Sequence, residues 1–370
     1  MEIIALLIIV FIVIFTETAV YRKYALYGIK YRVYLSKTEA YEGDEIEIIE
    51  EVTNNKLLPV PWLKSEIFTS RWLDFVGTKA NTAANTRFVP SVFALRPYQK
   101  CVRTWRVKCL KRGVFSLEDT SIVTCDIFGF VTRSVNIKVN ETVTVLPRPV
   151  YYVKSDFSYK LFYGNAITRR FICDDPFIIS GAREYSGFEP VSRIHWNSTA
   201  RENRLMVYNN DYTTENTVLV IMNMQRREGG NVVPALPNDI ELYIKITAAI
   251  LDTCASSGFR SGFAASGGNQ FGFTEFPADK IYSHIEILRG LAALDEQECY
   301  IDICDTINRI NFKNYTDIVI ITSFLSKRLL KTANRLNQAG LNVIFYSDRF
   351  EDTENEQEHS QYKILPIKRK

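Results

Sequence analysis

Hydrophobic residues are continuous at the start of the chain. An unbroken apolar run extends from Ile3 to Phe15, and weaker apolar character continues to Tyr21. As a helix, residues 3–21 are about 28 Å long, which is close to the hydrocarbon thickness of a bilayer. No positive charge precedes the run and no small-residue cleavage site follows it, so a signal peptide fits poorly. The pattern predicts a transmembrane anchor over residues 1–21.

The charges that follow this run have one sign. Every formal charge between Glu17 and Glu39 is positive, namely Arg22, Lys23, Lys30, Arg32 and Lys37. Because basic residues beside a membrane span stay on the cytoplasmic side, this flank predicts a single-pass protein of the cell membrane with its later domains in the cytoplasm.

Residues 28–149 alternate between apolar and polar positions in short runs that turn residues separate. The candidate strands include 31–35, 46–52, 65–69, 88–94, 102–109, 121–125 and 142–145. No helical period interrupts them, which predicts an antiparallel, Ig-like β-sandwich. Within it, Gly113 indicates a turn with positive φ, and Asp126 indicates a side chain that caps a turn.

The character of the chain changes over residues 150–370. Continuous apolar strands, such as Val218–Met222, alternate with segments of helical period that end at Gly258 and Gly340. The expected helices are 238–257, 283–294, 299–309 and 326–339, and the expected strands are 218–222, 259–265, 317–322, 341–346 and 362–367. This alternation predicts an α/β domain with a mostly parallel sheet.

Composition narrows the class of protein. The chain has 370 residues, of which 46% are hydrophobic, and a net charge of +3. The length suggests two or three folded units, and the charge gives no global attraction to nucleic acid. The 7 cysteines form no C-x-x-C pair and the 3 histidines have no metal-ligand spacing. We therefore expect reduced thiols and no His-based metal centre.

One long motif lies before the first continuous apolar strand. Residues 181–201 resemble the signature of the domain of unknown function 58 family: Gly-x-Arg-Glu-Tyr, then Gly-Asp, then Arg-x-Ile-x-Trp, then Ser-Ala-Arg. The matching residues are Gly181, Arg183, Glu184, Tyr185, Arg193, Ile194, Trp196, Ala200 and Arg201. The departures are Phe188 and Glu189 in place of Gly-Asp, and Thr199 in place of Ser. The turns around Gly43, Gly113 and Gly129 extend the resemblance over nearly the whole chain.

This resemblance implies a membrane-anchored β-sandwich, a von Willebrand factor A-like domain and a MoxR-type AAA+ ATPase as partner. Such a domain holds Mg²⁺ through Asp-x-Ser-x-Ser at the end of its first strand. Here Asn223, Gln225 and Arg227 occupy that region, and Ser323 stands where the family tends to carry Asp. We therefore expect a degenerate site without metal, and no cofactor.

Catalytic candidates are few. Cys173 and His195 could be imagined as nucleophile and base of a cryptic hydrolase, but a buried structural role is the commoner use of a cysteine. No glycine-rich phosphate loop is present. We predict no catalytic residues and no small-molecule substrate.

The signature itself admits two interpretations. Its charged and aromatic residues suit an ion-pair staple, or an interface with a partner. We expect Trp196 and Arg193 to support the fold, and Arg183 and Glu189 to face a partner; Glu184, Tyr185 and Arg201 complete the candidates. The sequence thus predicts a non-enzymatic, membrane-tethered scaffold or adaptor, with a cryptic hydrolase and an extracellular adhesion module as alternatives.

Overall fold

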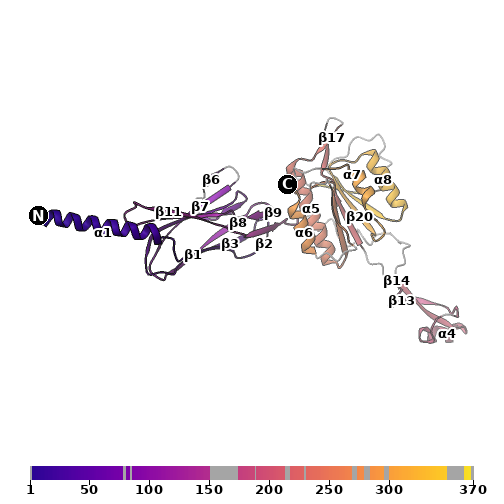
Figure 1. Ribbon diagram of the computed structural model, residues 1–370. Coiled ribbons are helices and arrows are strands. Elements are labelled where there is room, and N and C mark those ends of the chain that lie inside the picture. The colour runs from indigo at the N-terminus through magenta and orange to yellow at the C-terminus, as the bar shows by residue number, and fades with distance from the viewer. Residues whose placement is uncertain are drawn as a thin grey trace. The chain divides into compact units, whose positions relative to one another are not determined.

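The computed structural model describes residues 2–77, 81–83, 86–150, 174–187, 189–212, 217–228, 231–268, 273–278, 284–295, 300–347 and 362–367. The chain divides into two compact units (Figure 1). The first comprises Met1–Arg148 together with Leu288–Leu294, and the second comprises Pro149–Ile287 and Asp295–Lys370.

The N-terminal helix α1 (Glu2–Tyr24) ends against the strands of the first unit. Tyr21 is buried, and its hydroxyl donates to the carbonyl of Pro59 at 2.9 Å. The exposed apolar part, Ile3 to Phe15, is about 20 Å long, less than the roughly 30 Å of a bilayer core. Among the described residues, no helix is both long and apolar enough to cross a membrane. The predicted transmembrane anchor is thus corrected; near the end of α1, Glu17, Tyr21 and Arg22 make hydrogen bonds with the first unit.

The strands of the first unit form three sheets, with orders β1-β3-β8-β5, β11-β10-β4-β7-β6 and β2-β12-β9. The strands are β1 (Ile29–Leu35), β2 (Glu39–Tyr41), β3 (Glu45–Asn54), β4 (Val60–Ser70), β5 (Leu73–Phe75), β6 (Asn81–Ala83), β7 (Thr86–Leu95), β8 (Lys100–Cys109), β9 (Gly113–Ser116), β10 (Thr120–Cys125), β11 (Thr132–Ile137) and β12 (Thr142–Leu146). Pairing is antiparallel except between β2 and β12. The predicted antiparallel sandwich is therefore corrected to three sheets, one of them mixed.

The carboxylate of Glu50 is buried in the core of this unit. Alternate residues of the long strands point inward, as in β3 and β4, and give a core shared by the two larger sheets. Glu50 lies within it and accepts hydrogen bonds from the Tyr31 hydroxyl at 2.8 Å, the Ser91 hydroxyl at 2.6 Å and the Ser65 hydroxyl. Burial and the neighbouring Glu50 raise the pKa of Tyr31. The donors satisfy a charge that would otherwise be costly to bury.

The turn before β9 has a structural role. Gly113 has a φ of 147°, so the predicted positive-φ turn is confirmed. The preceding Arg112 is buried, and its guanidinium donates to the carbonyls of Leu291, Ala292 and Leu294 at 3.0–3.1 Å. Arg112 therefore satisfies carbonyls at the end of a helix within the same unit.

The main sheet of the second unit has the order β19-β18-β15-β20-β21-β22. Its strands are β15 (Thr217–Met222), β18 (Arg260–Ala265), β19 (Thr274–Phe276), β20 (Asp317–Thr322), β21 (Asn342–Ser347) and β22 (Lys363–Pro366). β19 runs antiparallel to β18, so the sheet is mixed and the prediction of a mostly parallel sheet is corrected. A short hairpin, β16 (Gln225–Glu228) and β17 (Asn231–Pro234), follows β15.

The helices of this unit are α5 (Pro237–Ser256), α6 (His284–Ala293, whose last residues count with the first unit), α7 (Ile303–Arg309) and α8 (Lys327–Gln338). Every residue of β15 and β20 is buried, as their unbroken apolar sequences predict. Gly258 and Gly340 follow α5 and α8 with positive φ, which confirms the predicted helix ends. Four parallel pairings place the carboxyl ends of β15, β18, β20, β21 and β22 along one edge.

Candidate functional site

A cluster of buried polar side chains lies where β15 and β20 end. Asn223 follows β15, and its amide nitrogen donates to the hydroxyl of Thr322, the last residue of β20, at 3.1 Å. The amide oxygen of Asn223 accepts from the backbone N–H of Gln225 at 3.1 Å and from the hydroxyl of Ser266 at 3.2 Å. All four residues are buried. We call this set the strand-end cluster.

The cluster does not fit a Mg²⁺ site. The Thr322 hydroxyl bonds to the carbonyl of Phe324 at 2.8 Å, and the Ser323 hydroxyl bonds to the carbonyl of Gln225 at 2.8 Å. These oxygens are thus engaged with the protein itself, and no carboxylate joins them, although a hard cation prefers charged oxygen ligands. Arg227 lies in β16 with its side chain exposed. No group of His, Cys, Asp or Glu suited to a metal occurs among the described residues.

One oxygen of the cluster differs from the others. The side-chain Oε1 of Gln225 is buried and has no hydrogen-bond partner within the described structure. A buried acceptor without a partner carries a desolvation cost. No local pattern predicts this unpaired oxygen, because it depends on the course of the chain from β15 into β16.

The signature segment folds around a second, smaller sheet. β13 (Asp174–Glu184) pairs antiparallel with β14 (Met206–Tyr212), and the chain between them forms the 3₁₀ turn η1 (Val191–Arg193) and helix α4 (Trp196–Glu202). His195 caps α4: its Nδ1 accepts from the backbone N–H of Ser198 at 3.0 Å. The ring of His195 also contacts that of Tyr208, with centroids 4.5 Å apart.

Glu189 is held inside the segment. Its carboxylate pairs with the Arg183 guanidinium at 2.6 Å and accepts from the Ser186 hydroxyl at 2.6 Å and from the Ser186 backbone N–H at 3.1 Å. These bonds, led by the Ser186 hydroxyl and including that of Arg183, lower the pKa of Glu189 to about 2. The expectation that Glu189 faces a partner is corrected, since its side chain is only 10% exposed.

The expectation that Trp196 supports the fold from a buried position is wrong. The side chain was predicted to be buried, yet it is 62% exposed. Ile194 and Val207, which form a β-bridge, are the buried apolar residues of the segment instead. α4 has 7 residues and starts at Trp196, and none of its residues is buried.

The remaining signature residues occupy intermediate or exposed positions. Tyr185 is half-buried and its backbone N–H donates to Leu205 at 2.8 Å. Glu184 is exposed, with its carboxylate 3.9 Å from the Arg204 guanidinium. Arg201 is exposed in the last turn of α4, and Arg193 is half-buried in η1. The structure thus gathers the predicted signature residues in one small segment, and no hydrogen bond among the described residues joins that segment to the strand-end cluster.

The cryptic-hydrolase alternative gains nothing from the described residues. Cys173 lies outside them, and the Nδ1 of His195 is engaged in capping α4. Burial raises the pKa of Cys109 to about 11 and that of Cys254 to about 12. A thiol with a raised pKa is a poor nucleophile because little of it is thiolate at neutral pH.

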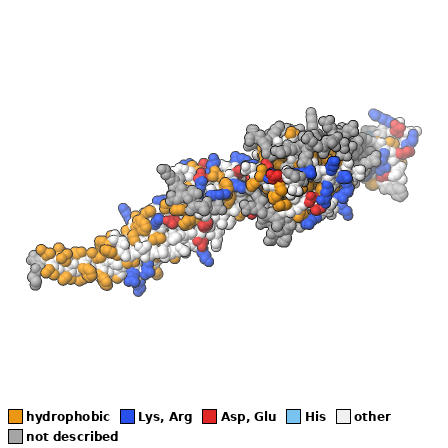
Figure 2. Space-filling model, turned by 90° about the horizontal axis from the view of Figure 1, so that it is seen from above, with side chains coloured by type: hydrophobic (Ala, Val, Ile, Leu, Met, Phe, Trp, Pro, Cys, Tyr) orange, Lys and Arg blue, Asp and Glu red, His pale blue; other side chains and the backbone are white. Residues whose placement is uncertain are grey.

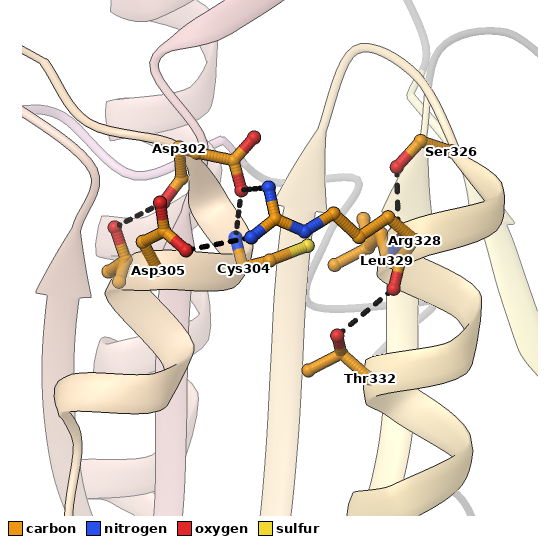
Figure 3. A network of polar contacts seen from close by, with 8 residues as sticks. Asp302, Cys304, Asp305, Ser326, Arg328, Leu329 and Thr332 are labelled. Atoms are coloured by element: carbon orange, nitrogen blue, oxygen red, sulfur yellow. Dashed lines mark hydrogen bonds and ion pairs between the residues drawn. The ribbon is translucent and has the colours of Figure 1, made fainter.

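A network of polar contacts joins α7 to α8 (Figure 3). Asp302 caps α7 by accepting from the backbone N–H of Cys304 at 2.8 Å, and Ser326 caps α8 by accepting from that of Leu329 at 3.1 Å. The Arg328 guanidinium lies 2.9 Å from Asp305 and 3.5 Å from Asp302. The sequence analysis missed this network, although Asp and Ser directly before helices are a recognisable cap signal. The contacts serve to hold two helices together.

Several solved structures resemble parts of the chain. Spo0M, a sporulation control protein from Bacillus subtilis, is 12% identical, with a TM-score of 0.20, over 31% of this chain and 49% of its own length. A CARDB domain from Pyrococcus furiosus is 14% identical, with a TM-score of 0.21, over 33% and 90%. A non-cellulosomal cohesin from Archaeoglobus fulgidus is 15% identical, with a TM-score of 0.22, over 32% and 91%. These TM-scores are too low to establish a shared fold.

No curated protein matches the chain. None of these comparisons confirms the von Willebrand factor A-like assignment or the membrane anchoring that the resemblance implied. The strand-end cluster and the segment with Trp196 nevertheless fall within one matched region. Residues 181–350 match the family model described as Protein of unknown function DUF58.

Proposed function

We propose that the protein is a non-enzymatic scaffold or adaptor that binds a protein partner through the signature segment. The observation that carries this proposal is the 62% exposure of Trp196 inside the family-matched region. A large apolar side chain exposed to water gains free energy when a partner covers it, and Trp is the residue type most enriched in binding hot spots.

The segment around Trp196 is organised before any partner arrives. His195 caps α4, and the Thr199 hydroxyl accepts from the backbone N–H of Met206 at 3.0 Å, which joins α4 to β14. The Arg183–Glu189 pair fixes the turn that leads to α4. Pre-organisation lowers the entropy lost on binding, so a small surface can still contribute useful affinity.

The partner that we propose is a MoxR-type AAA+ ATPase, and this choice rests on the family resemblance alone. In this arrangement the ATPase supplies the chemistry and this chain supplies the binding surface, in the assembly or regulation of other proteins. We place the interaction in the cytoplasm, since the described cysteines Cys101, Cys109, Cys125, Cys254 and Cys304 are free thiols.

The test is capture of a purified MoxR-type ATPase, encoded in the same genome, on the immobilised full chain. Trp196→Ala should weaken capture by roughly 30-fold, the equivalent of a 2 kcal/mol hot spot. Val232→Ala, an exposed apolar residue of β17, is the matched control and should leave capture unchanged.

Thermal unfolding of both variants completes the experiment. Trp196→Ala should change the free energy of unfolding by no more than about 0.5 kcal/mol, as is usual for a change of an exposed residue. Equal capture by wild type and Trp196→Ala would overturn the proposed surface. Failure of the wild type to capture the ATPase would overturn the partner.

A further inference from the structure

We propose that the loop between β10 and β11, together with the adjoining part of α1, docks on an anionic lipid surface. This inference is independent of the proposed function, because it concerns the first unit and not the signature segment. It rests on an apolar loop tip, on an aromatic and basic rim, and on the contacts that fix both against α1.

The loop displays three large apolar side chains. Ile127, Phe128 and Phe130 are 60%, 51% and 69% exposed, and the two phenyl rings lie 6.3 Å apart. Such a cluster of exposed apolar side chains at one loop tip is unusual unless something covers it.

Asp126 makes this display rigid. It is buried, its carboxylate accepts from the backbone N–H of Val131 at 2.9 Å, and its carbonyl accepts from that of Gly129 at 3.2 Å. The prediction that Asp126 caps a turn is confirmed. Because the loop closes around this side chain, the aromatic residues stay outside and do not fold back onto the sheet.

Helix α1 meets the loop where its apolar part ends. The carboxylate of Glu17 accepts from the backbone N–H of Ile127 at 3.1 Å. On the adjoining strand β11, the Arg133 guanidinium donates to the carbonyl of Arg22 at 3.0 Å. The exposed apolar side chains from Ile3 to Phe15 therefore begin next to the loop tip, and the two surfaces adjoin.

The rim of this surface is aromatic and basic. Tyr24 and Tyr27 are 42% and 72% exposed, and Arg22, Lys23 and Arg133 are exposed as well. Figure 2 shows the apolar surface of α1 with basic side chains near the end of the helix. An apolar surface bordered by basic and aromatic side chains matches a lipid interface, where acyl chains take up apolar side chains and anionic headgroups attract Lys and Arg. The charge complementarity favours an anionic lipid surface over a protein as the occupant.

The test uses the full chain with vesicles of phosphatidylcholine, with and without phosphatidylserine. The reporter is Phe128→Trp, and the control is Val114→Trp at a 55% exposed position on β9. With anionic vesicles, the emission of the Phe128→Trp chain should shift to shorter wavelength and should be quenched by brominated lipid, whereas that of Val114→Trp should not change. A second variant, Phe128→Ser with Phe130→Ser, should weaken vesicle binding by roughly tenfold or more, since each buried phenyl contributes about 1.5–3 kcal/mol.

Two further measurements test the role of the basic side chains and the folding of the variants. Arg22→Glu with Lys23→Glu should remove the preference for phosphatidylserine, and the thermal midpoint of every loop variant should stay near wild type because the changed side chains are exposed. Vesicle binding with an unchanged emission at position 128, or binding that survives the double serine variant, would overturn the proposal and assign the loop to a protein contact.

Discussion

The region 181–350 contains two polar sites that differ in what they present to the solvent. The strand-end cluster around Asn223 is buried, and its amide and hydroxyl groups bond mainly to one another. The segment around Trp196 has an exposed indole, and the Arg183 guanidinium of its ion pair is exposed while the Glu189 carboxylate is held inside. The first site therefore uses its polar groups for stability, while the second leaves the apolar area of Trp196 exposed to solvent.

The difference follows from the elements that carry each site. Asn223 and Thr322 sit at the ends of two strands that are buried along their whole length, so their side chains cannot reach solvent. Trp196 begins a helix of 7 residues beside a two-stranded sheet, which has too little apolar surface to bury it. A polar motif at a buried strand end is thus a poor indicator of binding, and an exposed aromatic on a short, capped helix is a better one.

The largest expected effect is a loss of stability on mutation of the strand-end cluster. Asn223→Ala leaves the Gln225 N–H and the Ser266 hydroxyl without their acceptor, and unpaired buried groups cost about 1–3 kcal/mol each. We expect the free energy of unfolding to fall by about 2–4 kcal/mol in urea titration. Asn334→Ala, on the exposed side of α8, is the control and should change little. Equal unfolding curves for wild type and Asn223→Ala would show that the cluster contributes nothing to stability.

The two sites should also differ in how their stability depends on pH. The folded pKa of Glu189 is about 2, below the ordinary 4.5. Between these values the unpaired carboxyl binds more protons than the paired one, so the ion pair stabilises the segment above pH 4.5 and is lost as the pH falls through 2. The carboxyl resonance of Glu189, followed by NMR, should titrate near pH 2 in wild type and at a somewhat higher pH in Arg183→Ala, in which the bonds from Ser186 remain and still lower the pKa. The strand-end cluster has no ionisable side chain and should show no such dependence. A wild-type midpoint near 4.5 would contradict the ion pair.

A smaller effect is expected at Gln225. Its buried Oε1 has no partner in the described structure, so Gln225→Met removes an unsatisfied acceptor while keeping the size of the side chain. The free energy of unfolding should stay level or rise by about 1 kcal/mol. Gln338→Met, at an exposed position on α8, controls for the effect of Met itself. A clear loss of stability specific to Gln225→Met would mean that this oxygen has a partner in solution.

No effect at all is expected from magnesium at the strand-end cluster. A ligand that binds the native state and not the unfolded chain raises the melting temperature, by an amount that grows with the logarithm of its concentration above Kd. Since the oxygens of Asn223, Thr322 and Ser323 are engaged in hydrogen bonds, millimolar Mg²⁺ should leave the thermal midpoint unchanged. A saturable rise that disappears in Asn223→Ala would contradict this assignment.

Much of the second unit was predictable because its signals are local. Residues 218–222 and 318–321 are uninterrupted apolar runs within β15 and β20, and the helices before Gly258 and Gly340 have a clear period and stop. The antiparallel β19 was missed because 3 residues cannot carry a recognisable alternation. The resemblance of residues 181–201 correctly marked the segment that holds Trp196.

The features that were predicted wrongly or missed depend on contacts between residues that are distant in sequence. The end of α1 looked like the end of a membrane span, whereas Tyr21 is buried and its hydroxyl donates to the carbonyl of Pro59, 38 residues away. Arg112 reaches Leu291, which no periodicity can anticipate. Trp196 was assigned to the core by size alone, although burial depends on whether a neighbouring surface exists to cover the side chain.

The central claim is that a partner covers the segment around Trp196 and does not contact the strand-end cluster. Hydrogen–deuterium exchange of the full chain, with and without the purified ATPase, measures this at both sites in one experiment. We predict slower exchange of backbone amides in α4 when the ATPase is present, and no change at Asn223–Gln225. Unchanged exchange in α4, with protection at the strand-end cluster instead, would contradict the account.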